Sequence, residues 1–177
     1  MIASRLSVLP VSSALSVAMN GITIRRATRA DAQGIADLVN LGEREGQLLP
    51  RSLAEIRASI NNWIVAAESG RIIGCGSLLE MSPVLSEIRS LEVAPEYRRN
   101  SVGAKIVAAL VELAHARGIP TVFALTRAVP FFEKLGFTVT VKDNFPEKVW
   151  RDCNICPVQF ACDEVAMVLS VTGQEAS

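Results

Sequence analysis

The sequence predicts one layered domain of the α/β class, in an α+β arrangement, with a mixed sheet flanked by helices. Short β-rich runs alternate with helical patterns along the chain, and the clearest helical pattern covers residues 101–117. With 177 residues, of which 50% are hydrophobic, the chain has the length and the apolar material of one compact domain. We therefore expect a single core-forming unit.

Alternation and turn residues mark the expected strands. Residues 22–26 alternate apolar and charged side chains, as an edge strand does. Residues 68–71, Glu-Ser-Gly-Arg, separate two β-rich runs and so predict a hairpin. Strands are expected at 22–26, 63–67, 72–79, 87–93, 121–126, 137–141 and 165–171.

Capping signals mark the expected helices. Thr28 with Asp31 and Ser52 with Glu55 are capping boxes, in which a hydroxyl is followed three residues later by a carboxylate. The long helix at 101–117 has apolar residues at helical spacing and is ended by a glycine and a proline. A further proline and glycine delimit a short helix between 130 and 136.

The ends of the chain are expected to lie outside the domain. Residues 1–20 carry one charge and an apolar stretch broken by Pro10, a poor signal peptide, so we predict a disordered extension or a start at Met19. The domain is expected at 21–172, with a tail at 173–177.

The charge balance excludes some partners. Lys plus Arg equals Asp plus Glu at 18 each, so no global field favours nucleic acid or an acidic membrane. No apolar run reaches the roughly 20 residues that span a bilayer. We expect a cytoplasmic protein with reduced thiols that binds a small molecule through local charges. The sequence leaves both a monomer and a homodimer as alternatives.

The most informative stretch is residues 91–107, LEVAPEYRRNSVGAKIV, where a strand passes through a basic loop into the long helix. Small residues in the first helical turn let a ligand approach the backbone. The first N–H groups and the helix dipole favour a phosphate there, and Arg98 and Arg99 add charge-assisted bonds. The plain alternative is a basic, solvated turn before an ordinary helix.

This stretch resembles the coenzyme A loop of the GNAT superfamily of acetyltransferases. The resemblance in this stretch consists of the pattern Val93-x-Pro95-x-x-Arg98 followed by a turn of small residues. Further along the chain, residues 131–137, FFEKLGF, resemble the family segment FYEKLGF. The resemblance covers residues 22–171 and implies a GNAT-like, twisted mixed sheet whose fourth and fifth strands splay apart. It implies acetyl-CoA as cosubstrate. The family pattern for the loop is Arg/Gln-x-x-Gly-x-Gly/Ala, which here reads Arg98-Arg99-Asn100-Ser101-Val102-Gly103, so Ser101 stands where the pattern has its first glycine.

The resemblance also implies a set of cofactor-binding residues. Backbone groups of Leu91 and Val93 are expected to bond the pantetheine arm like an added strand. The full expected set is Leu91, Val93, Arg98, Arg99, Asn100, Ser101, Val102, Gly103, Ala104 and Phe131.

Three further segments, 48–52, 87–91 and 123–127, and the run from 148 to 164 resemble the short GNAT-type N-acetylglutamate synthases. Glutamate brings two carboxylates, and the planar guanidinium of arginine matches a carboxylate well. We therefore expect Arg51, Arg89 and Arg127 to bind it. The alternatives are a surface helix residue for Arg51, a solvent-facing strand residue for Arg89, and an internal carboxylate partner for Arg127.

The expected chemistry is direct transfer to the amine, which must first lose a proton. Glu87 is the candidate base, with a salt-bridged strand carboxylate as the alternative, and Glu92 is weaker because it points to the opposite face from Leu91. A backbone N–H, that of Val93, is expected to polarise the thioester. In much of the family a tyrosine is the general acid for the leaving thiolate. Phe132 stands at the matching position here, so the general acid is unassigned.

Some polar residues and two rival functions complete the expectations. Tyr97 is expected to pack and His115 to be exposed. Cys153-x-x-Cys156 and Cys162 are expected to be buried or half-buried thiols, with zinc binding or redox sensing as alternatives; no metal is expected. The rival functions are acetylation of another amine and a coenzyme A-binding module without turnover.

Overall fold

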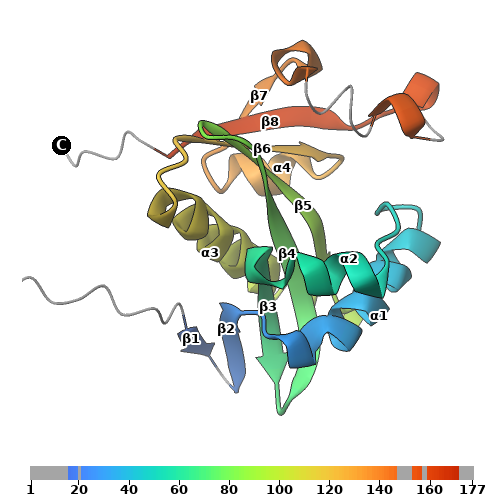
Figure 1. The fold of residues 1–177 in the computed structure, drawn as a ribbon, viewed down its shortest axis with the longest axis vertical. Helices are drawn as coiled ribbons and strands as arrows, with labels where there is room; N and C mark the ends of the chain where they lie inside the picture. Colours follow the sequence, from blue (N-terminus) through green and yellow to red (C-terminus); the bar gives the residue numbers. More distant parts are fainter. Residues whose placement is uncertain (1–15, 20, 147–152, 157–158, 172–177) are drawn as a thin grey trace, which may run out of the picture.

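The computed structural model describes residues 16–19, 21–146, 153–156 and 159–171. They form one eight-stranded sheet in the order β1-β2-β3-β4-β5-β6-β8-β7 (Figure 1). All neighbouring strands are antiparallel except β5 and β6, which are parallel. The strands are β1 Ser16–Met19, β2 Ile22–Arg26, β3 Trp63–Glu68, β4 Arg71–Ser82, β5 Leu85–Val93, β6 Thr121–Thr126, β7 Thr138–Thr140 and β8 Val165–Ser170.

Helices cover both faces of this sheet, so it is the middle layer of three. Helices α1 (Ala32–Arg44) and α2 (Leu53–Ala58) bury Ile35, Val39 and Ile56 against one face. Helix α3 (Val102–Ala116) buries Ile106 and Leu110 against the other face, and the short helix α4 (Val129–Glu133) joins the same core. Figure 1 shows α1 and α2 on the opposite side of the strands from α3. The α/β fold with helices flanking a mixed sheet is confirmed.

Burial on both faces explains the composition of the central strands. Residues 63–67 are all buried, which is why this stretch is a continuous apolar run and does not alternate. On β4, the glycines lie directly under α3. A Cβ at Gly74 would stand 2.8 Å from Ile106 Cδ1, and one at Gly76 would stand 3.0 Å from Ile106 Cγ2. The missing side chains allow α3 to lie close to the sheet.

The feature that positions the functional site is the short pairing between β5 and β6. They pair at only three positions, Leu85 with Thr121, Ser86 with Val122, and Glu87 with Phe123. Beyond these positions β5 stays paired with β4, and β6 stays paired with β8. The two central strands therefore splay apart, as the resemblance predicts.

A β-bulge bends β5 inside the splayed region. The register between β4 and β5 shifts between Cys75 and Ser77, so that Ser90 and Leu91 together oppose one residue of β4. Ser90 has a φ of 53°, in the left-handed region that is rare for residues other than glycine. The bulge redirects the side chains that follow it along the strand.

The N-terminal boundary of the domain differs from the sequence expectation. Ser16–Met19 lie within the stretch expected to be disordered, yet they form β1 and pair antiparallel with Ile22–Arg25 of β2; for these four residues the expectation is wrong. The rest of the expected extension, 1–15 and 20, and the expected tail at 173–177 lie outside the described residues. No helix within the described ranges is long and apolar enough to cross a membrane.

The first capping box is confirmed, and it carries an ion pair. The Asp31 carboxylate accepts a hydrogen bond from the backbone N–H of Thr28 at 2.7 Å. It also accepts hydrogen bonds from both terminal nitrogens of Arg25, at 2.7 and 2.9 Å. Asp31 is buried, and its hydrogen bond with Arg25 is the main reason why its pKa falls to about 2. The contact ties the start of α1 to β2 beneath it.

Replacing Asp31 by Asn should destabilise the fold in a pH-dependent way. A lowered pKa adds stability above the unfolded-state value near 4, and this stability disappears as the pH falls through about 2. Asp31→Asn is therefore expected to lower the free energy of unfolding by about 2 kcal/mol at pH 7, with the difference vanishing near pH 2. Urea titrations across this pH range measure it. The exposed Asp37→Asn is the control, and an equal loss in both variants would contradict the assignment.

Candidate active site

A cavity of about 760 Å³ occupies the wedge between the splayed strands. Its walls come from the loop after α1, from β5, from β6, from α4 and from the segments on either side of the cysteines. The lining includes Leu48 and Arg51, Glu87, Arg89 and Leu91, Leu125 and Arg127, Phe131, and Lys142. The splay thus leaves a pocket between the two central strands.

Glu87 lies at the apex of the wedge. It is the last residue of β5 that pairs with β6, opposite Phe123, and it is only 2% exposed. Its side chain lines the cavity, where a carboxylate can accept a proton from a bound group.

Three arginines from three elements line the same cavity. Arg51 precedes the cap of α2, Arg89 lies on β5 two residues after Glu87, and Arg127 directly follows β6. The structure brings together the arginines that the sequence analysis selected. The Nε of Arg51 is buried and makes no hydrogen bond within the described part of the chain.

Arg127 already has protein partners. Its Nε donates to Asp163 Oδ1 at 2.5 Å, and its Nη1 donates to the carbonyl of Gly46 at 3.4 Å. The ion pair with Asp163 raises the pKa of Arg127. The internal carboxylate partner considered in the sequence analysis is therefore present, while the guanidinium, 42% exposed, still lines the cavity.

The loop before α3 has the backbone of an anion cradle. Arg99 and Ser101 have φ values of 70° and 60°, so the chain alternates into the left-handed region just before the helix. Such turns direct successive N–H groups to one side. The first bond of the helix ladder runs from the N–H of Lys105 to the carbonyl of Ser101, so the N–H groups of the preceding residues, Val102, Gly103 and Ala104, have no partner within the helix.

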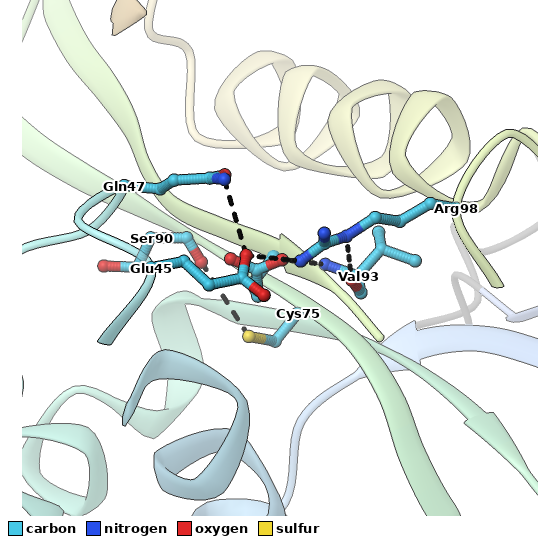
Figure 2. A network of polar contacts seen from close by, with 7 residues as sticks. Glu45, Gln47, Cys75, Ser90, Val93 and Arg98 are labelled. Carbon is cyan, nitrogen blue, oxygen red and sulfur yellow. Dashed lines mark hydrogen bonds and ion pairs between the residues drawn. The ribbon is translucent and has the colours of Figure 1, made fainter. Parts of the chain in front are cut away.

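The arginines of this loop diverge. Arg99 is exposed, as is Asn100, beside the start of α3. Arg98 folds back onto the protein instead: its Nε donates to the carbonyl of Val93 at 3.0 Å, and its Nη2 donates to Glu45 at 2.9 Å and to Glu92 at 3.1 Å (Figure 2). The guanidinium expected at the pyrophosphate is thus held by two carboxylates.

Val93 is engaged on both of its main-chain groups. Its N–H donates to Glu92 Oε1 at 3.0 Å, and its carbonyl accepts from Arg98. A thioester oxygen that accepts from the Val93 N–H, as the sequence analysis predicts, must displace Glu92, whereas the Val93 carbonyl has a second lone pair for a ligand donor. Leu91 lies on the cavity wall.

Glu92 points to the opposite face from Leu91, as predicted. A Cβ at Gly42 of α1 would stand 2.4 Å from Glu92 Oε2, so the carboxylate lies under the end of that helix. It is 5% exposed, and burial raises its pKa against the opposing effects of the Val93 N–H and Arg98. Glu92 is absent from the lining of the cavity that contains Glu87.

The aromatic residues line or support the cavity without adding a hydroxyl to it. Phe131 lines it and lies against Gly103, where an added Cβ would stand 3.5 Å from the ring. Phe132 is buried and packs edge-on to Phe131 with a centroid distance of 5.1 Å. Tyr97 packs against both cores and donates a hydrogen bond to Glu68, away from the cavity lining, so its expected packing role is confirmed.

Sequence reasoning missed one wall of the cavity. Cys153, Cys156 and Cys162 are half-buried, as expected, but they also line the cavity. Lys142 lines it as well and places its Nζ 3.1 Å from the Cys162 sulfur. No sequence pattern connects these residues to the arginines, because only the return of the chain into β8 brings them there. His115 is exposed, as expected.

Comparison with known proteins identifies the class. Residues 35–137, more than half of the chain, match the Acetyltransferase (GNAT) family. The chain belongs to this family, and it is an acyltransferase that uses acetyl-CoA as cosubstrate.

Two relatives show which members of the family this chain is similar to. An uncharacterized N-acetyltransferase of Chlorobaculum tepidum, CT2212, is 38% identical over 82% of this chain and 94% of its own length. An amino-acid acetyltransferase of Aeromonas salmonicida is 33% identical over 69% of this chain. The match spans only 28% of that longer protein.

Solved structures share the fold. Rv2747 of Mycobacterium tuberculosis, in complex with CoA and a second ligand, superposes with a TM-score of 0.71 at 27% identity, over 83% of this chain and 98% of its own. N-acetylglutamate synthase of Neisseria gonorrhoeae, complexed with coenzyme A and N-acetyl-glutamate, gives a TM-score of 0.76 at 25% identity, over 86% of this chain and 35% of its own.

The left-handed backbone at Ser101 predicts a stabilising substitution. An L-residue costs about 1–2 kcal/mol in this conformation, and glycine does not. After the larger backbone entropy of unfolded glycine is subtracted, Ser101→Gly should raise the free energy of unfolding by about 0.5–1 kcal/mol and Tm by about 2–4 °C. Thermal unfolding measures this.

Two other serines serve as comparisons. Ser69, with a φ of 49°, should respond to glycine in the same direction. Ser52, with a φ of −70° and a capping hydrogen bond to the Glu55 N–H, should lose stability. A loss of stability in Ser101→Gly would contradict the argument from strain.

Proposed function

We propose that this enzyme transfers the acetyl group of acetyl-CoA to the α-amino group of L-glutamate. The observation that carries the proposal is the convergence of Arg51, Arg89 and Arg127 on the cavity whose apex holds Glu87. On this proposal the chain acts in the cytoplasm, at the first step of arginine biosynthesis.

The charge of the cavity suits this substrate. Arginine binds a carboxylate through parallel, charge-assisted hydrogen bonds, and glutamate offers one carboxylate at each end. Lys142 adds a further cation to the same wall. The lining also contains Glu87, Asp143 and Glu164, so a polyamine or another cationic acceptor meets like charge only beside the arginines and Lys142.

The relatives support the same substrate class. The gonococcal protein of similar fold is an N-acetylglutamate synthase complexed with coenzyme A and N-acetyl-glutamate, and the Aeromonas relative is an amino-acid acetyltransferase. This chain spans only about a third or less of these two proteins, so the likeness concerns the acetyltransferase portion.

The proposed reaction is a direct transfer in a ternary complex. Glu87 accepts a proton from the glutamate ammonium, directly or through a water, and the neutral amine attacks the thioester carbonyl. The C–N bond forms, the carbonyl oxygen gains negative charge beside β5, and the nitrogen, now positively charged, releases its second proton to water. The C–S bond then breaks as the carbonyl re-forms. Coenzyme A leaves as a thiolate, which is feasible unaided because a cysteine-like thiol has a pKa of only about 8.5.

An assay of free thiol tests the proposal. Purified protein with acetyl-CoA and single amino acids should release thiol selectively with glutamate, and mass spectrometry should find N-acetyl-glutamate. Release with other amines but not with glutamate would refute the substrate. Binding of acetyl-CoA without release for any amine would identify a non-catalytic module.

Glu87→Gln should remove the base while preserving the shape of the site. We expect kcat with glutamate to fall by about 10²–10⁴-fold, because an amide cannot accept the ammonium proton. Calorimetry of acetyl-CoA binding is the control for folding and should give an unchanged Kd. A kcat within twofold of the original enzyme would exclude Glu87 as the base.

Arg127→Ala should separate substrate binding from cofactor binding. We expect KM for glutamate to rise about tenfold, while KM for acetyl-CoA stays within twofold, because a carboxylate loses a charged partner. Asp163→Asn is the matched control, since it breaks the same ion pair but keeps the guanidinium. Equal increases in both KM values for Arg127→Ala would remove this residue from the glutamate site.

A further inference from the structure

The loop that follows α1 forms one wall of the cavity. We call residues 45–49 the acceptor loop; Gly46, Gln47, Leu48 and Leu49 line the cavity, and Glu45 precedes them. The N–H groups of Gln47 and Leu48 both donate to the carbonyl of Gly42, at 2.9 and 3.2 Å. These bonds fix the loop to the last turn of α1, but they do not fix it to the sheet.

Arg98 connects the acceptor loop to β5. Its guanidinium meets the Val93 carbonyl at 3.0 Å and Glu92 at 3.1 Å, both on β5, and Glu45 at 2.9 Å, on the acceptor loop (Figure 2). Glu92 is only 5% exposed, whereas the side chains of Arg98 and Glu45 are 37% and 31% exposed, so only the β5 end of this connection is buried. The planar, multiply donating guanidinium is suited to join three acceptors in a fixed arrangement.

A second arginine holds the acceptor loop from the other side of the wedge. Arg127, at the end of β6, donates to the carbonyl of Gly46 at 3.4 Å. The loop is therefore attached to both splayed strands, through Glu45 and Arg98 on the β5 side and through Gly46 and Arg127 on the β6 side. Residues 46–49 of this loop and Arg51, two residues beyond it, line the same cavity.

We propose that Arg98 is a positioning residue for the amine acceptor: through Glu45 it holds the acceptor loop against β5 and so shapes the acceptor side of the cavity. This inference rests on the proposed function, since it assumes that the acceptor binds in this cavity. It differs from the sequence expectation that Arg98 binds the cofactor phosphates. If Arg98 positions the acceptor, its loss should raise KM for the acceptor. If it binds the cofactor phosphates, its loss should raise KM for acetyl-CoA.

The test uses Glu45→Gln, which removes the negative charge from the contact with the loop and leaves Arg98 paired with Glu92. We expect KM for the acceptor to rise about three- to fivefold, the effect of losing a partly exposed ion pair, with KM for acetyl-CoA unchanged. Glu43→Gln is the matched control, because Glu43 is an exposed neighbour on α1 with no ion pair among the described residues. It should change neither KM.

Variants of Arg98 complete the cycle. Arg98→Met should raise KM for the acceptor at least as much as Glu45→Gln does, and Arg98→Lys should raise it less than Arg98→Met. The double variant Glu45→Gln with Arg98→Met should have the same acceptor KM as Arg98→Met alone, because both changes remove one interaction. An unchanged acceptor KM in Glu45→Gln overturns the inference. An increase confined to the acetyl-CoA KM in Arg98→Met also overturns it and favours a phosphate ligand.

The failure of the inference is distinguishable from failure of the proposed function. The thiol-release assay of the original enzyme with glutamate tests the proposed function. If the enzyme acetylates another amine instead, that amine is used for the KM measurements. Amide hydrogen exchange at Gln47 and Leu48 judges the inference without turnover. Faster exchange in Glu45→Gln than in Glu43→Gln supports it, and equal exchange in the two variants overturns it.

Discussion

The structure depends on the separation of β5 from β6 after three paired positions. Each strand keeps its other neighbour, so the sheet stays continuous while two strand edges face each other across a wedge. Unpaired edges inside a protein are costly unless a ligand or side chains satisfy them. At Val93 the side chains of Glu92 and Arg98 fulfil that role. The wedge is therefore both a gap in the sheet and a place where an extended ligand arm can bind.

Local charge, and not net charge, defines the site. The 18 basic residues balance the 18 acidic ones, yet Arg51, Arg89, Arg127 and Lys142 gather around one cavity. Internal partners hold some of these cations, as Asp163 holds Arg127. Buried Glu92 in turn needs Arg98, because an unpaired carboxylate in the interior is strongly unfavourable. Arg127, for which we propose a substrate-binding role, thus also has a structural partner.

Periodicity predicted the elements well, and it predicted the connections between them poorly. The apolar run at 63–67 and the helix at 101–117 follow from residue spacing, and the structure has β3 and α3 there. The splay came from family resemblance, since no local pattern reports which neighbour a strand loses. The position of the Arg98 guanidinium could not be predicted, because its partner Glu45 is 53 residues away. Strand β1 was missed because its four residues gain their conformation from pairing with β2.

A crystal structure of the enzyme with coenzyme A and N-acetyl-glutamate bound tests the central claim most directly. The account predicts that the pantetheine arm lies between β5 and β6, with the acetyl group near Glu87 and the carboxylates beside the arginines. The diphosphate should contact the first N–H groups of α3. Coenzyme A bound elsewhere, such as in the second cavity of about 540 Å³ between α1, the start of β4 and residues 94–96, with the wedge empty, would contradict the account.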